Sequence, residues 1–185
     1  MRETLLVIVA ITAMLAGFYL SARHFSEPEA APAPRMMPGP VTGGDLLGSF
    51  RPDFQLGSNN GGFVGPGDYS GKTILLNFWA TWCAPCREEM PMLMDLQNQY
   101  GPDGLQVIGI ALDDAENVRS FISKYGISYP VLVGGEDVFE TSSAYGNDEG
   151  VLPYTVLIDK TGVVRWRYAG LIRHDNISSV LSELL

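Results

Sequence analysis

Apolar stretches alternate with amphipathic stretches through most of the chain after residue 72. A strongly apolar run at 73–79 predicts a buried strand, and the amphipathic segment at 85–100 predicts a helix. Further strands are predicted at 105–112, 130–133, 154–158 and 163–168, and further helices at 115–125, at 137–145 and from a cap at Asp175 to residue 184. Strands joined by helices and followed by a terminal hairpin predict an α/β fold, a mixed central sheet flanked by helices on both faces.

The N-terminal part of the chain has a different composition. Residues 4–20 are uncharged and almost wholly apolar, and as a helix they would span roughly 25 Å, at the short end for crossing a bilayer. We therefore expect a membrane anchor in residues 1–25, with a cleaved signal peptide as the alternative. Residues 26–49 are rich in Pro, Ala, Gly and Glu and predict an extended linker. The folded domain is expected over residues 50–185.

The only two cysteines, Cys83 and Cys86, lie between the first predicted strand and the first predicted helix. Cys83 is expected at the helix N-terminus, where unsatisfied backbone N–H groups and the helix dipole favour the thiolate. Cys86 would lie one turn into the helix, close enough to attack a mixed disulfide formed by Cys83. The pair therefore predicts dithiol redox chemistry.

Other interpretations of the cysteine pair are weaker. A purely structural disulfide across so short a loop gains little chain entropy. A closed zinc site needs four ligands, and the chain has only His24 and His174 to add. We therefore expect no metal and no cofactor. A net charge of −9 also argues against nucleic acid as a partner.

The segment LNFWATWCAPCREEMP at 76–91, together with GVLPYTVLID at 150–159 and the hairpin that follows, resembles the membrane-tethered thioredoxin-like disulfide reductases of the TlpA, ResA and CcmG type. The resemblance covers about residues 51–185. It implies a thioredoxin fold with an added helix and strand at 115–133 and an N-terminal hairpin. It also implies a location on the periplasmic side of the bacterial inner membrane and a role in cytochrome c maturation or oxidase assembly. The implied partners are client proteins that carry disulfides and a dithiol electron donor in the membrane.

The same resemblance assigns roles to single residues. Cys83 matches the nucleophile and Cys86 the resolving thiol, while Pro153 matches a cis-proline beside the dithiol. Pro91 matches a proline inside the active-site helix. The residues expected to contact the client are Trp82, Ala84, Pro85 and Leu152.

Two further positions concern proton transfer. Asn77 stands where cytoplasmic thioredoxins have a buried acid, and a carboxamide cannot take up a proton. Glu89 matches an active-site glutamate of the resembling family, and one helical turn would bring it near the cysteines. Partial desolvation there would raise the pKa of this carboxyl toward neutrality. The alternative is a solvated glutamate like its neighbour Glu88.

Three function classes remain open from the sequence. The first is an envelope disulfide reductase. The second is a disulfide oxidase or isomerase, although Ala84 offers no charge or donor of the kind that would stabilise the thiolate of a strong oxidant. The third is a copper-binding module that uses Cys83, Cys86 and His174 as ligands.

Overall fold

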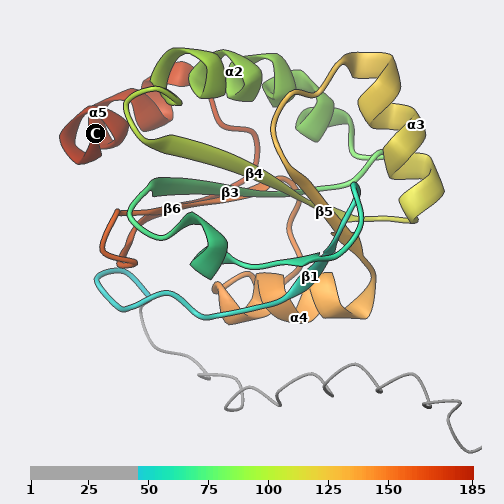
Figure 1. Ribbon diagram of the computed structural model, residues 1–185, viewed down its shortest axis with the longest axis horizontal. Helices are drawn as coiled ribbons and strands as arrows, with labels where there is room; N and C mark the ends of the chain where they lie inside the picture. Colours follow the sequence, from blue (N-terminus) through green and yellow to red (C-terminus); the bar gives the residue numbers. More distant parts are fainter. Residues whose placement is uncertain (1–45) are drawn as a thin grey trace, which may run out of the picture. The chain divides into compact units, whose positions relative to one another are not determined.

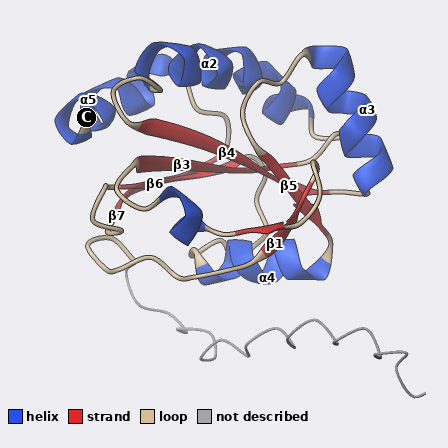
Figure 2. Ribbon diagram, viewed as in Figure 1, coloured by secondary structure: helices blue, strands red, loops and turns tan. Residues whose placement is uncertain are grey.

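The computed structural model describes residues 46–185, which contain a seven-stranded mixed sheet in the order β2-β1-β5-β4-β3-β6-β7. The strands are β1 (Leu56–Ser58), β2 (Phe63–Val64), β3 (Thr73–Trp79), β4 (Leu105–Leu112), β5 (Val131–Gly134), β6 (Tyr154–Ile158) and β7 (Val164–Ala169). The helices are a short 3-10 helix η1 (Pro66–Tyr69), α2 (Ala84–Tyr100), α3 (Ala115–Tyr125), α4 (Glu136–Ala144) and α5 (His174–Leu184). Helices α2, α3 and α5 cover one face of the sheet and α4 covers the other (Figure 1, Figure 2). The expected mixed sheet with helices on both faces is confirmed.

The centre of the sheet positions the cysteine pair. Every residue of β3 is buried, as expected for a strand covered on both faces, and β3 runs parallel to β4. On its other side β3 pairs antiparallel with β6, so that Phe78 lies opposite Tyr154. The end of β3 is therefore beside the start of β6. The loop that carries Cys83 and the loop that carries Pro153 meet at this edge of the sheet.

The N-terminal hairpin predicted from the resemblance is present. Strands β1 and β2 pair antiparallel, and β1 also pairs antiparallel with β5 through Gly57 and Val133. The chain packs on the domain from Leu46 onward, since this side chain is only 8% exposed and belongs to the apolar core cluster below the sheet. Phe50 then forms an isolated bridge with Val163. The packed region therefore begins a few residues before position 50.

The start of the last helix differs from the prediction. Asp175 was expected as its cap, but α5 begins at His174 and its N-cap is Arg173. The Arg173 backbone N–H donates to Asn176 Oδ1 at 2.7 Å, so the short polar side chain that fixes this helix start lies three residues inside it. Elsewhere the predicted strands and helices agree with the structure to within one residue.

The predicted anchor at residues 4–20 and most of the linker at 26–49 lie outside the described residues. Within residues 46–185, none of the helices combines the length and the apolar character needed to cross a bilayer.

Candidate functional site

Cys83 and Cys86 lie where β3 leads into α2. Cys83 is the N-cap of α2, and its Sγ accepts a hydrogen bond from the Cys86 backbone N–H at 3.3 Å. The two residues form a disulfide with their Cα atoms 5.4 Å apart. Cys83 is 5% exposed, whereas Cys86 is fully buried at 0%. The more accessible cysteine is therefore the one at the helix N-terminus, where the backbone N–H groups and the dipole favour a thiolate.

The residues that flank Cys83 face solvent. Trp82 is 67% exposed, and Ala84 and Pro85 are also exposed, so solvent reaches all three. Their contact with a client stays a prediction. Trp79, in contrast, is fully buried and packs against Phe121 with the ring centroids 5.1 Å apart. The two tryptophans therefore differ in role, because Trp79 supports the site from inside while Trp82 forms part of its surface.

A second loop approaches the dithiol from β6. The peptide bond between Leu152 and Pro153 is cis, as the resemblance implies. Leu152 is partly buried and packs against the apolar cluster that contains Cys83 and Cys86. Because the start of β6 pairs with the end of β3, the loop with Leu152 and Pro153 lies at the same end of the sheet as the loop with Cys83, although the two are about 70 residues apart along the chain.

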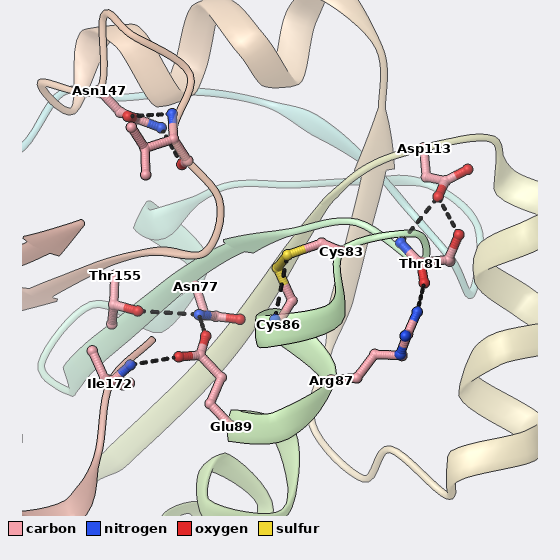
Figure 3. The surroundings of a disulfide bond; sticks show 11 residues. Asn77, Thr81, Cys83, Cys86, Arg87, Glu89, Asp113, Asn147, Thr155 and Ile172 are labelled. Carbon is pink, nitrogen blue, oxygen red and sulfur yellow. Dashed lines mark hydrogen bonds between the residues drawn. A yellow bond between two sulfur atoms is a disulfide. The ribbon is translucent and has the colours of Figure 1, made fainter. Parts of the chain in front are cut away.

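Glu89 lies beneath the dithiol on the buried side of α2 (Figure 3). Its side chain is only 1% exposed, whereas Glu88 is exposed, so the alternative of a solvated glutamate is wrong. Asn77 Nδ2 donates to Glu89 Oε1 at 2.6 Å, and the Ile172 backbone N–H donates to Oε2 at 2.9 Å. Burial raises the pKa of Glu89 from 4.5 to about 7, although both hydrogen bonds act to lower it. This carboxyl can therefore gain or lose a proton near neutral pH.

Asn77 connects Glu89 to the sheet. Its Nδ2 also donates to Thr155 Oγ1 at 3.1 Å, and these two residues lie directly opposite each other on β3 and β6. On the other side Asn77 lies opposite Gly109, where a Cβ would come within 3.0 Å of Trp79 Nε1. A glycine at this position of β4 thus leaves room for the Trp79 indole. The sequence alone did not indicate that Thr155 or the Ile172 backbone belongs to this site.

The loop before Cys83 is held by a carboxylate at the end of β4. Asp113 Oδ2 accepts hydrogen bonds from the Thr81 hydroxyl and, at 3.0 Å, from the Thr81 backbone N–H. Arg87 Nη1 donates to the Thr81 carbonyl at 3.0 Å, which ties the loop to α2 as well. Burial raises the pKa of Asp113, but the hydrogen bonds that its carboxylate accepts outweigh burial and hold the pKa below its ordinary value. Sequence reasoning missed Asp113, although its place directly after a buried strand was a usable signal.

The copper-binding alternative is not supported by the described residues. Within residues 46–185, no three or more His, Cys, Asp or Glu side chains are grouped so that they could hold a metal ion. Cys83, Cys86 and His174 therefore do not form a ligand set.

Comparison with known proteins agrees with this geometry. The AhpC/TSA family model matches residues 47–167, which is more than half of the chain. The chain belongs to the AhpC/TSA family. The chain is 30% identical over 183 residues to the thiol-disulfide oxidoreductase ResA of Geobacillus thermodenitrificans, a match that covers 98% of this chain and 94% of the relative. It is 36% identical over 129 residues to the thioredoxin-like protein YneN of Bacillus subtilis, covering 66% of this chain and 71% of that protein.

Solved structures show the same similarity. A thiol:disulfide interchange protein of the thioredoxin family from Chlorobium tepidum superposes with a TM-score of 0.65 at 26% identity, covering 76% of this chain and 99% of that chain. A thiol-disulfide oxidoreductase from Bacteroides fragilis superposes with a TM-score of 0.66 at 28% identity, covering 74% of this chain and 100% of that chain. The thioredoxin-like fold is confirmed, and the protein is a thiol-disulfide oxidoreductase of the ResA type.

Proposed function

We propose that this protein is a reductase of the bacterial cell envelope that reduces disulfides in client proteins through Cys83 and Cys86. The observation that carries this proposal is that Cys83, Cys86 and Glu89 follow one another along α2 from the protein surface into its interior. Cys83 is at the surface end of α2, Cys86 is fully buried below it, and the buried carboxyl of Glu89 follows one turn further along the helix. This arrangement provides a nucleophile that a client can reach, together with a resolving thiol and a proton acceptor that water reaches poorly.

The reaction begins from the reduced dithiol. The Cys83 thiolate attacks one sulfur of the client disulfide, the client S–S bond breaks, and the departing client sulfur takes up a proton. Cys86 then loses its proton to the Glu89 carboxylate, and the Cys86 thiolate attacks the Cys83 sulfur of the mixed disulfide. The second client sulfur leaves as a thiolate and is protonated, so the client gains two electrons. The protein is left with the Cys83–Cys86 disulfide seen in the structure.

Asn77 supports both protonation states of Glu89 in this scheme. Its Nδ2 donates to the carboxylate, as the structure shows. Its Oδ1 is buried with no hydrogen-bond partner, so a turn of the carboxamide would offer an acceptor to the protonated form.

The envelope location and the electron donor are part of the proposal. The support for them is the apolar stretch at residues 4–20, which suits an anchor in the inner membrane with the domain on the periplasmic side. Because that compartment is kept oxidising, a reductase there needs a dithiol donor in the membrane to resupply electrons. Cytochrome c maturation or oxidase assembly is the process that we propose for its clients.

The reduction potential tests the direction of transfer. With only Ala84 and Pro85 between the cysteines, nothing beyond the helix N-terminus stabilises the reduced form. We expect a potential near that of thioredoxin, roughly −270 to −200 mV, from titration of the protein in glutathione buffers followed by thiol counting. A value near about −120 mV, typical of a dedicated oxidant, would contradict the reductase and favour the oxidase or isomerase alternative.

Cell fractionation tests the location. The full chain is expected in the membrane fraction, and a variant without residues 1–25 is expected to be soluble, folded and redox-active, because the proline-rich linker separates the apolar stretch from the domain. The measurement is immunoblotting of membrane and soluble fractions, followed by a disulfide-reduction assay on each. Recovery of the full chain in the soluble fraction would contradict the anchor.

A further inference from the structure

Asn147 holds the loop that leads to Pro153 by pairing with the backbone of one residue. Its Oδ1 accepts a hydrogen bond from the Val151 N–H at 2.9 Å, and its Nδ2 donates to the Val151 carbonyl, also at 2.9 Å. The same Nδ2 donates to Ser142 Oγ at 2.8 Å. The side chain is only 4% exposed, and Figure 3 shows it on the loop beside the disulfide. This carboxamide therefore satisfies both the N–H and the carbonyl of Val151, as the backbone of a neighbouring strand would.

The two residues after Val151 differ in how their backbone is satisfied. The Pro153 carbonyl accepts a hydrogen bond from the Gly170 N–H at 2.8 Å, and proline has no N–H to donate. The backbone N–H and carbonyl of Leu152 have no hydrogen bond to any other residue in the described part of the chain. Of Val151, Leu152 and Pro153, only Leu152 leaves both a donor and an acceptor of its backbone without a partner.

We propose that Asn147 is a positioning residue that sets where a client pairs with this protein. An extended client segment that reaches the dithiol needs backbone partners, and it takes them from whatever N–H and carbonyl groups are free. Because Asn147 already occupies both groups of Val151, the client segment pairs with Leu152 alone. Its register relative to the Cys83 sulfur is then fixed. This inference rests on the proposed function, since it concerns polypeptide clients.

The residue type at position 147 matters for a chemical reason. Only a carboxamide places a donor and an acceptor side by side, as the backbone of a strand does. An aspartate at this position would keep the acceptor but lose both donors, and it would place a negative charge next to the Val151 carbonyl. A serine is too short to reach both backbone groups. The Asn147→Ser variant therefore frees both backbone groups of Val151, and Asn147→Asp frees only the carbonyl. Ser142→Ala, which removes only the contact to Ser142, is the matched control.

The test compares two disulfide substrates of the full-length protein, with dithiothreitol as reductant. One is a synthetic peptide with a single internal disulfide, and the other is hydroxyethyl disulfide, which has no backbone to pair. For Asn147→Ser and Asn147→Asp we expect kcat/KM for the peptide to fall about fivefold to tenfold, the effect of about one net hydrogen bond, because part of the bound peptide then pairs with Val151 in a register that does not bring its disulfide to Cys83. The rate with hydroxyethyl disulfide and the reduction potential should not change. Ser142→Ala should behave as the wild type.

A second measurement uses no Asn147 variant. In the mixed disulfide between the Cys86→Ser protein and the peptide, amide hydrogen exchange should slow at Leu152 and stay unchanged at Val151. If the Asn147 variants lose activity equally with the peptide and with hydroxyethyl disulfide, or if amide exchange at Leu152 is unchanged, the inference is overturned. The proposed reductase function would not be affected by either result. Failure of the wild-type protein to reduce either substrate would instead overturn the proposed function, and this inference with it.

Discussion

Replacing Cys83 with serine is expected to reduce the rate of disulfide reduction to the background given by the reductant alone. Cys83 is the more exposed of the two cysteines and occupies the N-cap of α2, so we expect it to make the first attack on a client. The measurement is the rate of peptide disulfide reduction with dithiothreitol as the electron source. The variant should form no mixed disulfide on a non-reducing gel.

The Cys86→Ser variant is the matched control for this prediction. It keeps the nucleophile and loses only the resolving thiol, so one attack remains possible and mixed disulfides with clients should accumulate. Expressed in the envelope, the same variant would capture clients for identification. If Cys83→Ser accumulates mixed disulfides and Cys86→Ser does not, then the roles of the two cysteines are reversed.

Replacing Glu89 with glutamine should slow the resolving step at least about 100-fold at neutral pH, the usual contribution of a positioned acid or base. The reason is that Glu89 is the buried carboxyl that we propose takes the Cys86 proton. In the wild-type protein the rate constant for release from the mixed disulfide should rise with pH through about 7, where burial places the pKa of Glu89. The variant should lose this inflection. Stopped-flow release of a peptide from the mixed disulfide, measured across pH, gives both quantities.

The same carboxyl should make stability depend on pH. The folded protein holds the Glu89 proton up to a pKa of about 7, whereas the unfolded chain releases it near 4.5. The folded state therefore binds more protons between these values, and the free energy of unfolding should fall as pH rises from 4.5 to about 7, by up to about 3 kcal/mol. Denaturant unfolding of the wild-type protein, Glu89→Gln and the exposed control Glu88→Gln measures this change. A slope that persists in Glu89→Gln, or an unchanged resolving step, would refute the role of this residue.

The local sequence determined most of the secondary structure and the place of the dithiol. The apolar run of β3 and the helical spacing of α2 are local patterns, so Cys83 could be placed at a helix N-terminus before any tertiary contact was known. Glu89 and Pro153 were identified by resemblance to a family. A helical spacing or a strand-initial proline does not by itself indicate a catalytic residue. The cap of α5 was placed wrongly because several short polar residues lie together at that helix start.

The tertiary structure decided what surrounds those residues. Whether Glu89 is buried or solvated depends on Ile172 and on Asn77, which come from α5's leading loop and from β3, 83 and 12 positions away in sequence. The pairing of Asn147 with Val151 spans only four residues, yet its meaning depends on β6 lying beside β3 at the dithiol. The pKa of a carboxyl and the availability of a backbone group are set by desolvation and by hydrogen-bond partners. Both arise only when distant segments pack together, and for that reason a linear pattern of residue types could name the reacting atoms but not their environment.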